Sequence, residues 1–325
     1  MALVLGDTGP CGSRKRACSK LKSQERSRII VIAVTYQTDD LALRFVRDVA
    51  AASCGASMQI VLVDNSERHS SEQLFDLILA ESPDVLCVKP PENLGYFGGA
   101  SFGFNTFLST GQGFDWVIVS NVDVEFHSPG FFAHLGRIDP VEDVGVVAPS
   151  ILSTLSHHDQ NPFMLQRPSR SRMRFYQLLY RSYYLLNLYE VLAMAQYLAG
   201  SAIRTSFDCL SARLMASSDQ GHTQGTRLQE GSRIPIYAPH GACIVFSKEF
   251  FNRGGRLEVP FFLYGEEIHV AEMARALGLG VLYDPCLCVQ HNEHQSTRRG
   301  TLWVSREAAN HLRETTDYLV DAYFS

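Results

Sequence analysis

Several common features are missing from the sequence, and each absence excludes a class of protein. The 325 residues contain no apolar run long enough to span a membrane, so we expect no membrane-spanning helix. The first residues lack the apolar segment of a secretory signal peptide. None of the eight cysteines forms a C-x-x-C pair, which disfavours a structural zinc site. We therefore expect reduced thiols and a cytoplasmic location.

An excess of basic residues is missing as well. Lys and Arg total 29 against 34 for Asp and Glu, so the formal net charge is −5 and no general nucleic-acid-binding surface is expected. The distribution is uneven, because much of the positive charge lies near the N-terminus. We expect residues 1–27 to form a basic flexible tail outside the catalytic part. Contact of this tail with anionic lipid is the alternative.

The hydrophobic fraction of 46% is high enough for a large folded core, and its pattern predicts the fold. Nearly continuous β-branched runs alternate with helical patterns, as expected for strands that are buried on both faces. This order predicts an α/β fold with a mostly parallel, Rossmann-like sheet flanked by helices. The expected strands lie at 28–36, 59–63, 85–89, 116–120 and 144–149, and the expected helices at 41–52, 70–80 and 97–109.

The second half of the chain is less regular. Residues 151–233 interrupt the alternation, and we expect a helical insertion with one long, aromatic-rich helix over 172–204. Packing in the core or in an acceptor cleft, a dimer contact and a membrane-surface contact remain open for this helix. Strand and helix patterns resume at 234–295, and the C-terminal segment 296–325 is expected to be helical.

Polar residues follow the ends of several expected strands. They are Tyr36, Asp64, Asn93 and Asp123. In a parallel sheet such residues share one edge, where the ligands of these folds gather. Asn121 and Asp123 are two residues apart at a strand end, so their side chains point the same way. Both could therefore reach one Mg²⁺ or Mn²⁺ ion, whereas a turn or a helix cap is the alternative.

Two further motifs at this edge have alternative interpretations. The carboxylate of Asp64 could accept hydrogen bonds from a base or a ribose, or it could close an Asx turn with its own backbone. The glycine-rich segment NLGYFGGA at 93–100 does not follow the first expected strand, as a dinucleotide-binding fingerprint would. Its glycines therefore predict a close approach of the backbone, either to a ligand or between a helix and the sheet.

Acidic and histidine residues of the last third of the chain are candidates for catalysis. Glu266 and Glu267 precede an expected helix. They could cap this helix, or supply a general base that deprotonates an attacking hydroxyl. His291 and His294 are candidate metal ligands, with ordinary surface histidines as the alternative. The residues alone leave both pairs of interpretations open.

Taken in order, these motifs resemble those of family 2 glycosyltransferases of the GT-A fold. The rhamnosyltransferase-like and galactofuranosyltransferase-like members, which act in bacterial polysaccharide assembly, are the most similar. The resemblance covers about residues 28–150 and 234–295. The motifs that carry it are TY at 35–36, VDNS at 63–66, NLGYFGGA at 93–100 with Asn105, NVD at 121–123, HGA at 240–242, FLYGEE at 262–267 and His291.

The resemblance implies an inverting transfer from a nucleotide-diphosphate sugar, with a divalent cation, Mg²⁺ or Mn²⁺, on the diphosphate. It makes 28–150 the nucleotide-sugar-binding half and 234–295 the acceptor-binding, catalytic half. By position, it assigns the metal to Asp123 and His291 and the catalytic base to Glu267. The residues that it assigns to the nucleotide-sugar pocket are Thr35, Tyr36, Asp64, Asn93, Gly95, Gly98, Gly99 and Asn121.

Some positions depart from the family pattern. Glu267 stands where the family usually has Asp, so Glu266 is a second candidate for the base. His269 replaces a further acid and Met273 an arginine, and the segment 151–233 has no counterpart. A non-catalytic carbohydrate-binding relative therefore remains an alternative. A sugar nucleotidyltransferase is another, although its usual glycine-rich basic loop after the first strand is missing.

The expected function is the transfer of a sugar to a hydroxyl of a saccharide or lipid-linked saccharide in cell-surface polysaccharide assembly. The expected partners are this acceptor and the nucleotide-sugar donor, without nucleic acid. A peripheral membrane contact and a homo-oligomer remain open. We expect the protein in the cytoplasm, with the inner face of the membrane as a more specific alternative. The sequence identifies neither the sugar nor the linkage.

Overall fold

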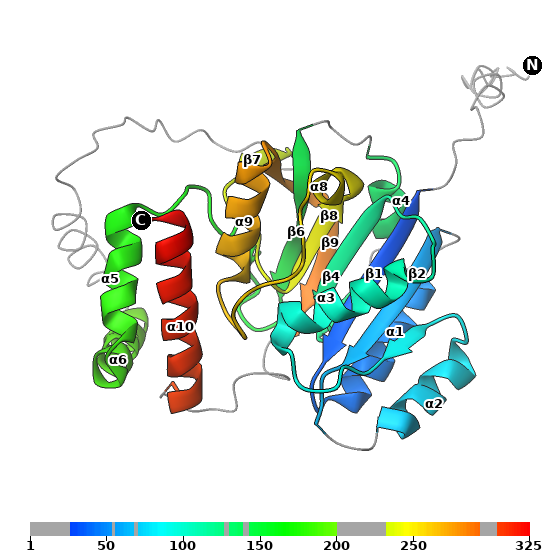
Figure 1. Ribbon diagram of the computed structural model, residues 1–325, viewed down its shortest axis with the longest axis horizontal. Coiled ribbons are helices and arrows are strands. Elements are labelled where there is room, and N and C mark those ends of the chain that lie inside the picture. The colour runs from blue at the N-terminus through cyan, green and yellow to red at the C-terminus, as the bar shows by residue number, and fades with distance from the viewer. Residues whose placement is uncertain are drawn as a thin grey trace, which may run out of the picture.

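The computed structural model shows a central sheet with helices on both faces (Figure 1). Most of the predicted basic tail, much of the second half of the predicted insertion and His294 lie outside the residues that it describes. The described residues are 27–53, 56–67, 71–126, 130–138, 143–199, 232–292 and 304–325, with the backbone alone at 193–199.

The first four strands are parallel and alternate with helices, as predicted. They are β1 Arg28–Thr35, β2 Ser57–Asp64, β3 Leu86–Val88 and β4 Trp116–Asn121, and the helices are α1 Asp39–Ala52, α2 Ser71–Glu81 and α3 Gly95–Leu108. In the sheet the order is β3, β2, β1, β4. Along β1, Ile29 and Val31 belong to the core on one face. Ile30 and Ile32 belong to the core on the other, which explains the continuous apolar run.

The second half of the sheet mixes parallel and antiparallel pairs. Its strands are β5 Val124–Glu125, β6 Val144–Ser153, β7 Ile234–Ile236, β8 Cys243–Ser247 and β9 Gly280–His291. Strand β8 runs antiparallel to both β4 and β6, and β9 runs parallel to β6 and antiparallel to β5 and β7. The predicted α/β sheet is confirmed. Its parallel character is limited mainly to the first half, because β8 is inserted between β4 and β6.

Helices cover both faces of this sheet. The remaining helices next to it are α4 Phe131–Leu135, α8 Lys248–Asn252 and α9 Glu266–Ala276. Helices α1, α2 and α4 bury their apolar sides against one face, and α3, α8 and α9 against the other. Figure 1 shows α3 lying across the front of the sheet. The polar motifs stand in the loops at the carboxyl ends of the strands.

The predicted single helix over 172–204 is wrong. The structure has two helices in this region, α5 Arg170–Tyr180 and α6 Tyr183–Ala199. Between them, the Ser182 hydroxyl accepts a hydrogen bond from the N–H of Leu185 at 3.3 Å, as a residue that caps the start of a new helix does. A local side-chain cap therefore divides a stretch whose apolar pattern is continuous.

The C-terminal segment forms the predicted helix, α10 Arg306–Tyr323. Helices α5 and α10 pack against each other beside α9, on the side of the molecule away from α1 and α2 (Figure 1). Of the helices that the structure describes, none combines the length and the apolar character that crossing a membrane requires. The cluster that joins α5, α9 and α10 consists of Met173, Ile268, Leu319, Val320 and Phe324.

Candidate functional site

The strand ends bring the predicted polar residues to one edge of the sheet. Strands β1, β2, β4 and β9 all end there, because the two antiparallel steps through β8 restore the direction of β4 in β6 and β9. Strand β8 runs the other way and begins at this edge, just after Gly241. The last residues of the four strands are Thr35, Asp64, Asn121 and His291.

Asp123 and His291 face each other at this edge. Asp123 lies in the turn between β4 and β5, and its Oδ1 stands 3.3 Å from Nε2 of His291. The main chain fixes this approach, because Val124 pairs with His291 and the N–H of Asn292 donates to the Asp123 carbonyl at 2.9 Å. Both side chains are buried. A carboxylate oxygen and an imidazole nitrogen at one point form a donor set that divalent metal ions can use.

The other ring nitrogen of His291 is held by Gln160. Nδ1 of His291 lies 2.8 Å from Oε1 of Gln160, so the amide oxygen accepts the Nδ1–H. In that tautomer Nε2 carries a lone pair, which faces the acceptor Oδ1 of Asp123. A cation bound between these two atoms would satisfy both of them, as would a second proton on the ring. The pair therefore fits a divalent metal ion, with Gln160 orienting the ring as the outer partners of metal-bound histidines do.

Asn121 stands one strand position before this turn. It is half-buried, and its N–H donates to the carbonyl of Ala242 at 2.9 Å, which joins the end of β4 to the start of β8. The contact belongs to the main chain. A role of the Asn121 side chain in the pocket therefore stays a prediction.

Glu266 and Glu267 begin α9 next to the same edge. The two preceding residues, Tyr264 and Gly265, both have left-handed backbones, with φ of 70° and 79°. A non-glycine residue seldom adopts this conformation, so the turn that presents the two acids is a strained one. Glu266 is buried, whereas Glu267 is half-buried. Its Oε1 lies against Gly241, where an added Cβ would stand 2.7 Å from that oxygen.

Tyr96 and Gly241 connect the metal pair to the acidic pair. The Tyr96 hydroxyl donates to the carbonyl of Gly241 at 3.0 Å. Burial raises the pKa of Tyr96 well above its ordinary value, and the charges of Glu266, Asp123 and Glu267 add to this effect. These carboxylates therefore lie close enough to Tyr96 to act on one hydroxyl. The predicted metal-binding and base residues belong to one site.

Burial also changes the protonation of the acidic pair. It raises the pKa of Glu266 from 4.5 to about 8, and the charge of Glu267 adds to the rise. Burial raises the pKa of Glu267 too, while hydrogen bonds with its own N–H and with the Gly241 backbone oppose the change. At neutral pH the pair therefore tends to hold one proton between its two carboxylates.

We expect Glu266→Gln to raise the melting temperature at pH 8 and to leave it nearly unchanged at pH 4.5. Because the folded-state pKa of Glu266 is raised from 4.5 to about 8, the folded state keeps a proton that the unfolded state has lost. Stability is therefore complete below the unfolded pKa and is lost as the pH rises through the folded one. The neutral amide avoids this loss. A rise of ~2 °C or more is expected at pH 8 by calorimetry.

The control for this measurement is Glu92→Gln. Glu92 is exposed. Its substitution should therefore give the same small effect at both pH values. An effect of Glu266→Gln that does not depend on pH would contradict the raised pKa.

Asp64 is held in a network of protein groups. Its Oδ1 accepts the N–H of Ser66 at 2.9 Å, which is the Asx turn that the sequence left open. Its Oδ2 accepts the hydroxyl of Ser71 and lies 3.7 Å from Nζ of Lys89. The carboxylate is buried, so these donors stabilise its charge. Contact of Asp64 with a base or ribose stays a prediction.

Thr35 and Tyr36 differ in their access to a ligand. Thr35 is buried, and its hydroxyl bonds with that of Thr38 at 2.9 Å. The N–H of Asn65 donates to the Thr35 carbonyl at 2.9 Å, which holds the ends of β1 and β2 together. Tyr36 exposes 46% of its surface. Of the two predicted pocket residues, Tyr36 is therefore the one whose side chain a ligand can reach.

The glycine-rich segment makes two kinds of close approach. Gly95 has φ of +73°, and an added Cβ would lie 1.9 Å from the carbonyl oxygen of Phe262, so the turn before α3 touches the loop before α9 directly. A Cβ at Gly99 would lie 3.0 Å from Val34, which is the contact of a helix with the sheet. Gly98 meets only Leu94 of its own turn. Helix and loop packing thus account for Gly95 and Gly99.

Asn65 was missed from the sequence, although it belongs to this turn. Its amide donates to the Gly95 carbonyl at 2.7 Å and accepts the N–H of Leu94 at 3.3 Å. Asn93 closes the turn from the other side, because its Oδ1 accepts the Gly95 N–H at 3.1 Å. Both amides therefore shape the turn. The sequence signal for Asn65 is its place directly after Asp64 at the end of a strand.

The first part of the predicted insertion closes the site. Strand β6 continues to Ser153, so the residues after it reach the same edge. There, Oδ1 of Asn161 accepts the N–H of His240 at 2.9 Å, and its amide nitrogen donates to the carbonyl of Pro149 at 2.8 Å. Burial lowers the pKa of His240 to about 4, so its ring beside His291 is neutral. Sequence reasoning missed Gln160 and Asn161.

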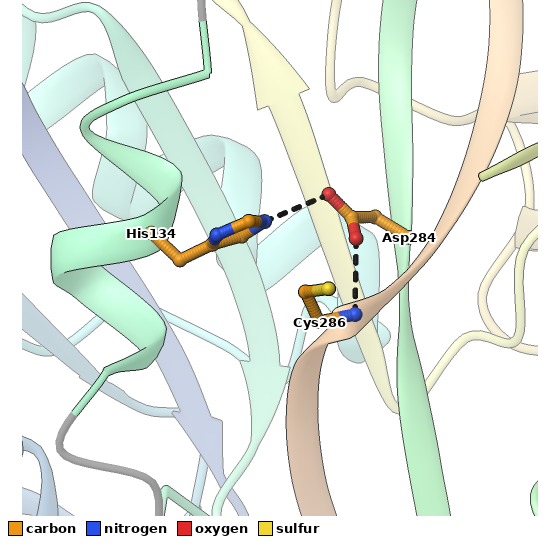
Figure 2. A group of neighbouring side chains, drawn as sticks. All are labelled: His134, Asp284 and Cys286. Atoms are coloured by element: carbon orange, nitrogen blue, oxygen red, sulfur yellow. Dashed lines mark hydrogen bonds and ion pairs between the residues drawn. The ribbon is translucent and has the colours of Figure 1, made fainter. Parts of the chain in front are cut away.

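A second cluster of side chains that could bind a metal lies nearer the start of β9 (Figure 2). His134 of α4 and Asp284 and Cys286 of β9 each bring one such atom within 4.8 Å of the others. Asp284 is fully buried, and its Oδ2 accepts the Nε–H of Arg233 at 2.8 Å. The guanidinium therefore supplies the positive charge that this carboxylate needs. We interpret the cluster as a structural contact between α4, β9 and the start of β7.

No protein-family model and no curated protein matches the chain. The crystal structure of GalNAc-T7 with UDP, GalNAc and Mn²⁺ matches 93% of it with a TM-score of 0.55 and 13% sequence identity. The mannosyltransferase PcManGT from Pyrobaculum calidifontis, in complex with GDP-Man and Mn²⁺, matches 85% with a TM-score of 0.46 and 16% identity. The chain spans 50% and 59% of their respective lengths. The likeness to GalNAc-T7 confirms the predicted GT-A fold.

Proposed function

We propose that the protein is a metal-dependent glycosyltransferase that moves a sugar from a nucleotide-diphosphate sugar to a hydroxyl group. One observation carries the proposal: the Asp123–His291 pair lies at the edge of the sheet where Glu267 lies against Gly241, whose carbonyl accepts the hydroxyl of Tyr96. The fold supports it, because GalNAc-T7, whose structure contains UDP, GalNAc and Mn²⁺, has the same fold.

Asp123 and His291 would hold the divalent cation, Mg²⁺ or Mn²⁺. These two residues fit a metal ion because Oδ1 of Asp123 and Nε2 of His291 lie only 3.3 Å apart. Gln160 contacts the other ring nitrogen of His291 and orients the ring. A cation bound there supplies Lewis-acid stabilisation to a diphosphate leaving group. Asn121, Gly98 and the exposed Tyr36 would complete the proposed donor pocket.

Glu267 acts as the base in this proposal. Its half-buried carboxylate accepts the proton of the acceptor hydroxyl. The hydroxyl oxygen forms a bond to the anomeric carbon while the bond from that carbon to the diphosphate oxygen breaks, so the nucleoside diphosphate leaves with the electron pair. Attack from the opposite face inverts the anomeric centre. Glu266 is buried beside it, and this burial raises the pKa of Glu266 to about 8.

The finer assignment rests on the ordered motifs. They support membership of family 2 and a rhamnosyltransferase-like or galactofuranosyltransferase-like activity in cell-surface polysaccharide assembly. A saccharide or lipid-linked saccharide in the cytoplasm, at the inner face of the membrane, is the acceptor in this proposal. The proposed halves of the site are 28–150 for the donor and 234–295 for the acceptor, joined by the contact of Gly95 with Phe262.

This function can be tested by incubating the protein with Mn²⁺, a panel of nucleotide-sugars and saccharide acceptors. The products are identified by mass spectrometry. The proposal predicts a glycosylated acceptor together with a nucleoside diphosphate. Formation of pyrophosphate instead would identify a nucleotidyltransferase. Binding of a donor without transfer or hydrolysis, over several acceptors, would identify a carbohydrate-binding relative.

We expect Gln160→Met to weaken Mn²⁺ binding by about tenfold or more, the usual effect of losing an outer partner of a metal-bound histidine. Methionine keeps the length of the side chain but cannot accept the Nδ1–H of His291 at the 2.8 Å contact. Isothermal titration with Mn²⁺ and a nucleoside diphosphate measures the affinity. Gln160→Glu should retain binding, and the exposed Gln166→Met serves as the control. Equal affinities in all four proteins would refute the role of Gln160.

A further inference from the structure

Helix α6 presents an unusually apolar surface to solvent. Six described residues of its first half are between 37% and 76% exposed. At 3.6 residues per turn they form one continuous arc of roughly 160° around the helix, without a charged residue in it. Isolated exposed apolar residues are ordinary, but a continuous face of this kind marks an interaction site. The six residues are Tyr184, Leu185, Leu188, Tyr189, Val191 and Leu192.

The opposite side of α6 holds the helix in a fixed orientation. Leu186 and Asn187 are both buried there. The Asn187 amide donates to the Tyr183 carbonyl at 2.9 Å and accepts the N–H of Val304 at 2.9 Å, which ties the helix to the chain before α10. The guanidinium of Arg306 stands 5.0 Å from the Tyr183 ring. The apolar arc therefore faces outward because the inner side is anchored.

The arc continues onto α5. The ring of Phe175 lies 6.3 Å from that of Tyr189, and Leu178 is 63% exposed. We call Phe175, Leu178 and the six exposed residues of α6 the α5–α6 surface. It combines apolar side chains from two helices, so it is too broad to be the contact of a single side chain.

The border of the α5–α6 surface is basic along α5. Helix α5 carries Arg170, Arg172 and Arg174 and has no acidic residue. All three are exposed, and no ion pair joins them to a carboxylate of the part of the chain that the structure describes. Burial raises the pKa of Tyr189, the charges of Tyr176 and Glu190 add to the rise, and the charge of Arg172 opposes it, so this guanidinium and one carboxylate both lie near the apolar arc.

We propose that the α5–α6 surface binds to a bilayer that contains anionic lipids. The apolar arc would enter the region between headgroups and acyl chains, and the arginines would contact the phosphates, as in helices that lie in a membrane surface. The described helices are not built to cross a bilayer. An anionic bilayer complements the basic border, whereas a second copy of the same surface would add like charges to it.

Flotation of the full-length protein with vesicles tests this inference. Vesicles of phosphatidylcholine alone are compared with vesicles that also contain phosphatidylglycerol. Wild-type protein should float with the anionic vesicles. The variant Leu185→Gln/Leu188→Gln/Leu192→Gln should lose at least tenfold in affinity. Its control replaces Leu77 and Leu79, exposed leucines of α2, by Gln and should bind as the wild type does.

A second set of variants separates the arginines from the basic tail. Arg170→Gln/Arg172→Gln/Arg174→Gln should lose about fivefold for each charge, and less at high salt. The matched variant Arg14→Gln/Lys15→Gln/Arg16→Gln removes the same charge from the tail. The inference is wrong if the wild type floats with neither vesicle, if the leucine variant binds like the wild type, or if the tail variant alone loses binding. Light scattering that shows a dimer lost in the leucine variant would also overturn it, in favour of a second copy as the occupant.

Discussion

Asp123→Ala should lower the rate of sugar transfer by about a thousandfold, equivalent to about 4 kcal/mol of transition-state stabilisation. Negative charge develops on the diphosphate as its bond to the sugar breaks. The carboxylate of Asp123, 3.3 Å from His291, is the anionic member of the site that would hold the neutralising cation. The initial rate of nucleoside diphosphate release at several Mn²⁺ concentrations measures the effect.

Two further variants separate this loss from a change in folding. Asp123→Asn keeps the shape of the side chain and should lose most of the activity as well, while its circular dichroism stays that of the wild type. The exposed Asp84→Ala should be fully active. Wild-type rates in both Asp123 variants, at any Mn²⁺ concentration, would rule out the proposed metal site.

Glu267→Gln should reduce kcat by about a thousandfold, within the range typical of the loss of a general base. The amide has the same size as the carboxylate but cannot take up the proton of the acceptor hydroxyl. Donor binding should change little, because the side chain lies against Gly241, on the acceptor side of the proposed pocket. Single-turnover transfer and titration with the donor measure the two quantities separately.

Glu266→Gln is the comparison that assigns the base. Glu266 is only 6% exposed and its pKa is raised to about 8, so we expect it to stay protonated during transfer and to be replaceable by an amide. Glu266→Gln should therefore retain much more activity than Glu267→Gln. The reverse order of activities would make Glu266 the base and would contradict the proposed division of roles.

The sequence predicted the elements that local patterns determine. The β-branched run of β1 is continuous because both of its faces are buried, and this alone marks a central strand. The edge at which Asp64, Asp123 and His291 gather follows from strand direction. The position of β8 between β4 and β6 could not be predicted from the sequence, because no local signal specifies which strands will be the neighbours of β8.

The missed site residues depend on contacts between distant segments. Gln160 reaches His291 only because β6 continues past Pro149 to Ser153 and runs beside β9. Asn161 holds His240 for the same reason. Neither residue belongs to a local motif, and the sequence pattern places both in the predicted insertion. The division of the predicted single helix into α5 and α6 depends on the cap formed by Ser182. The apolar pattern continues across this point and gives no sign of the cap.

Binding of a nucleotide-sugar together with Mn²⁺ is the result on which the proposed function depends most directly. A thermal-shift panel of nucleotide-diphosphate sugars, with and without Mn²⁺, measures it, because a ligand that binds only the folded state raises the melting temperature. We predict that at least one nucleotide-sugar raises the melting temperature of the wild type in the presence of Mn²⁺, and that Asp123→Ala abolishes this rise. No rise with any nucleotide-sugar, or an equal rise in Asp123→Ala, would contradict a metal-dependent glycosyltransferase site at this edge of the sheet.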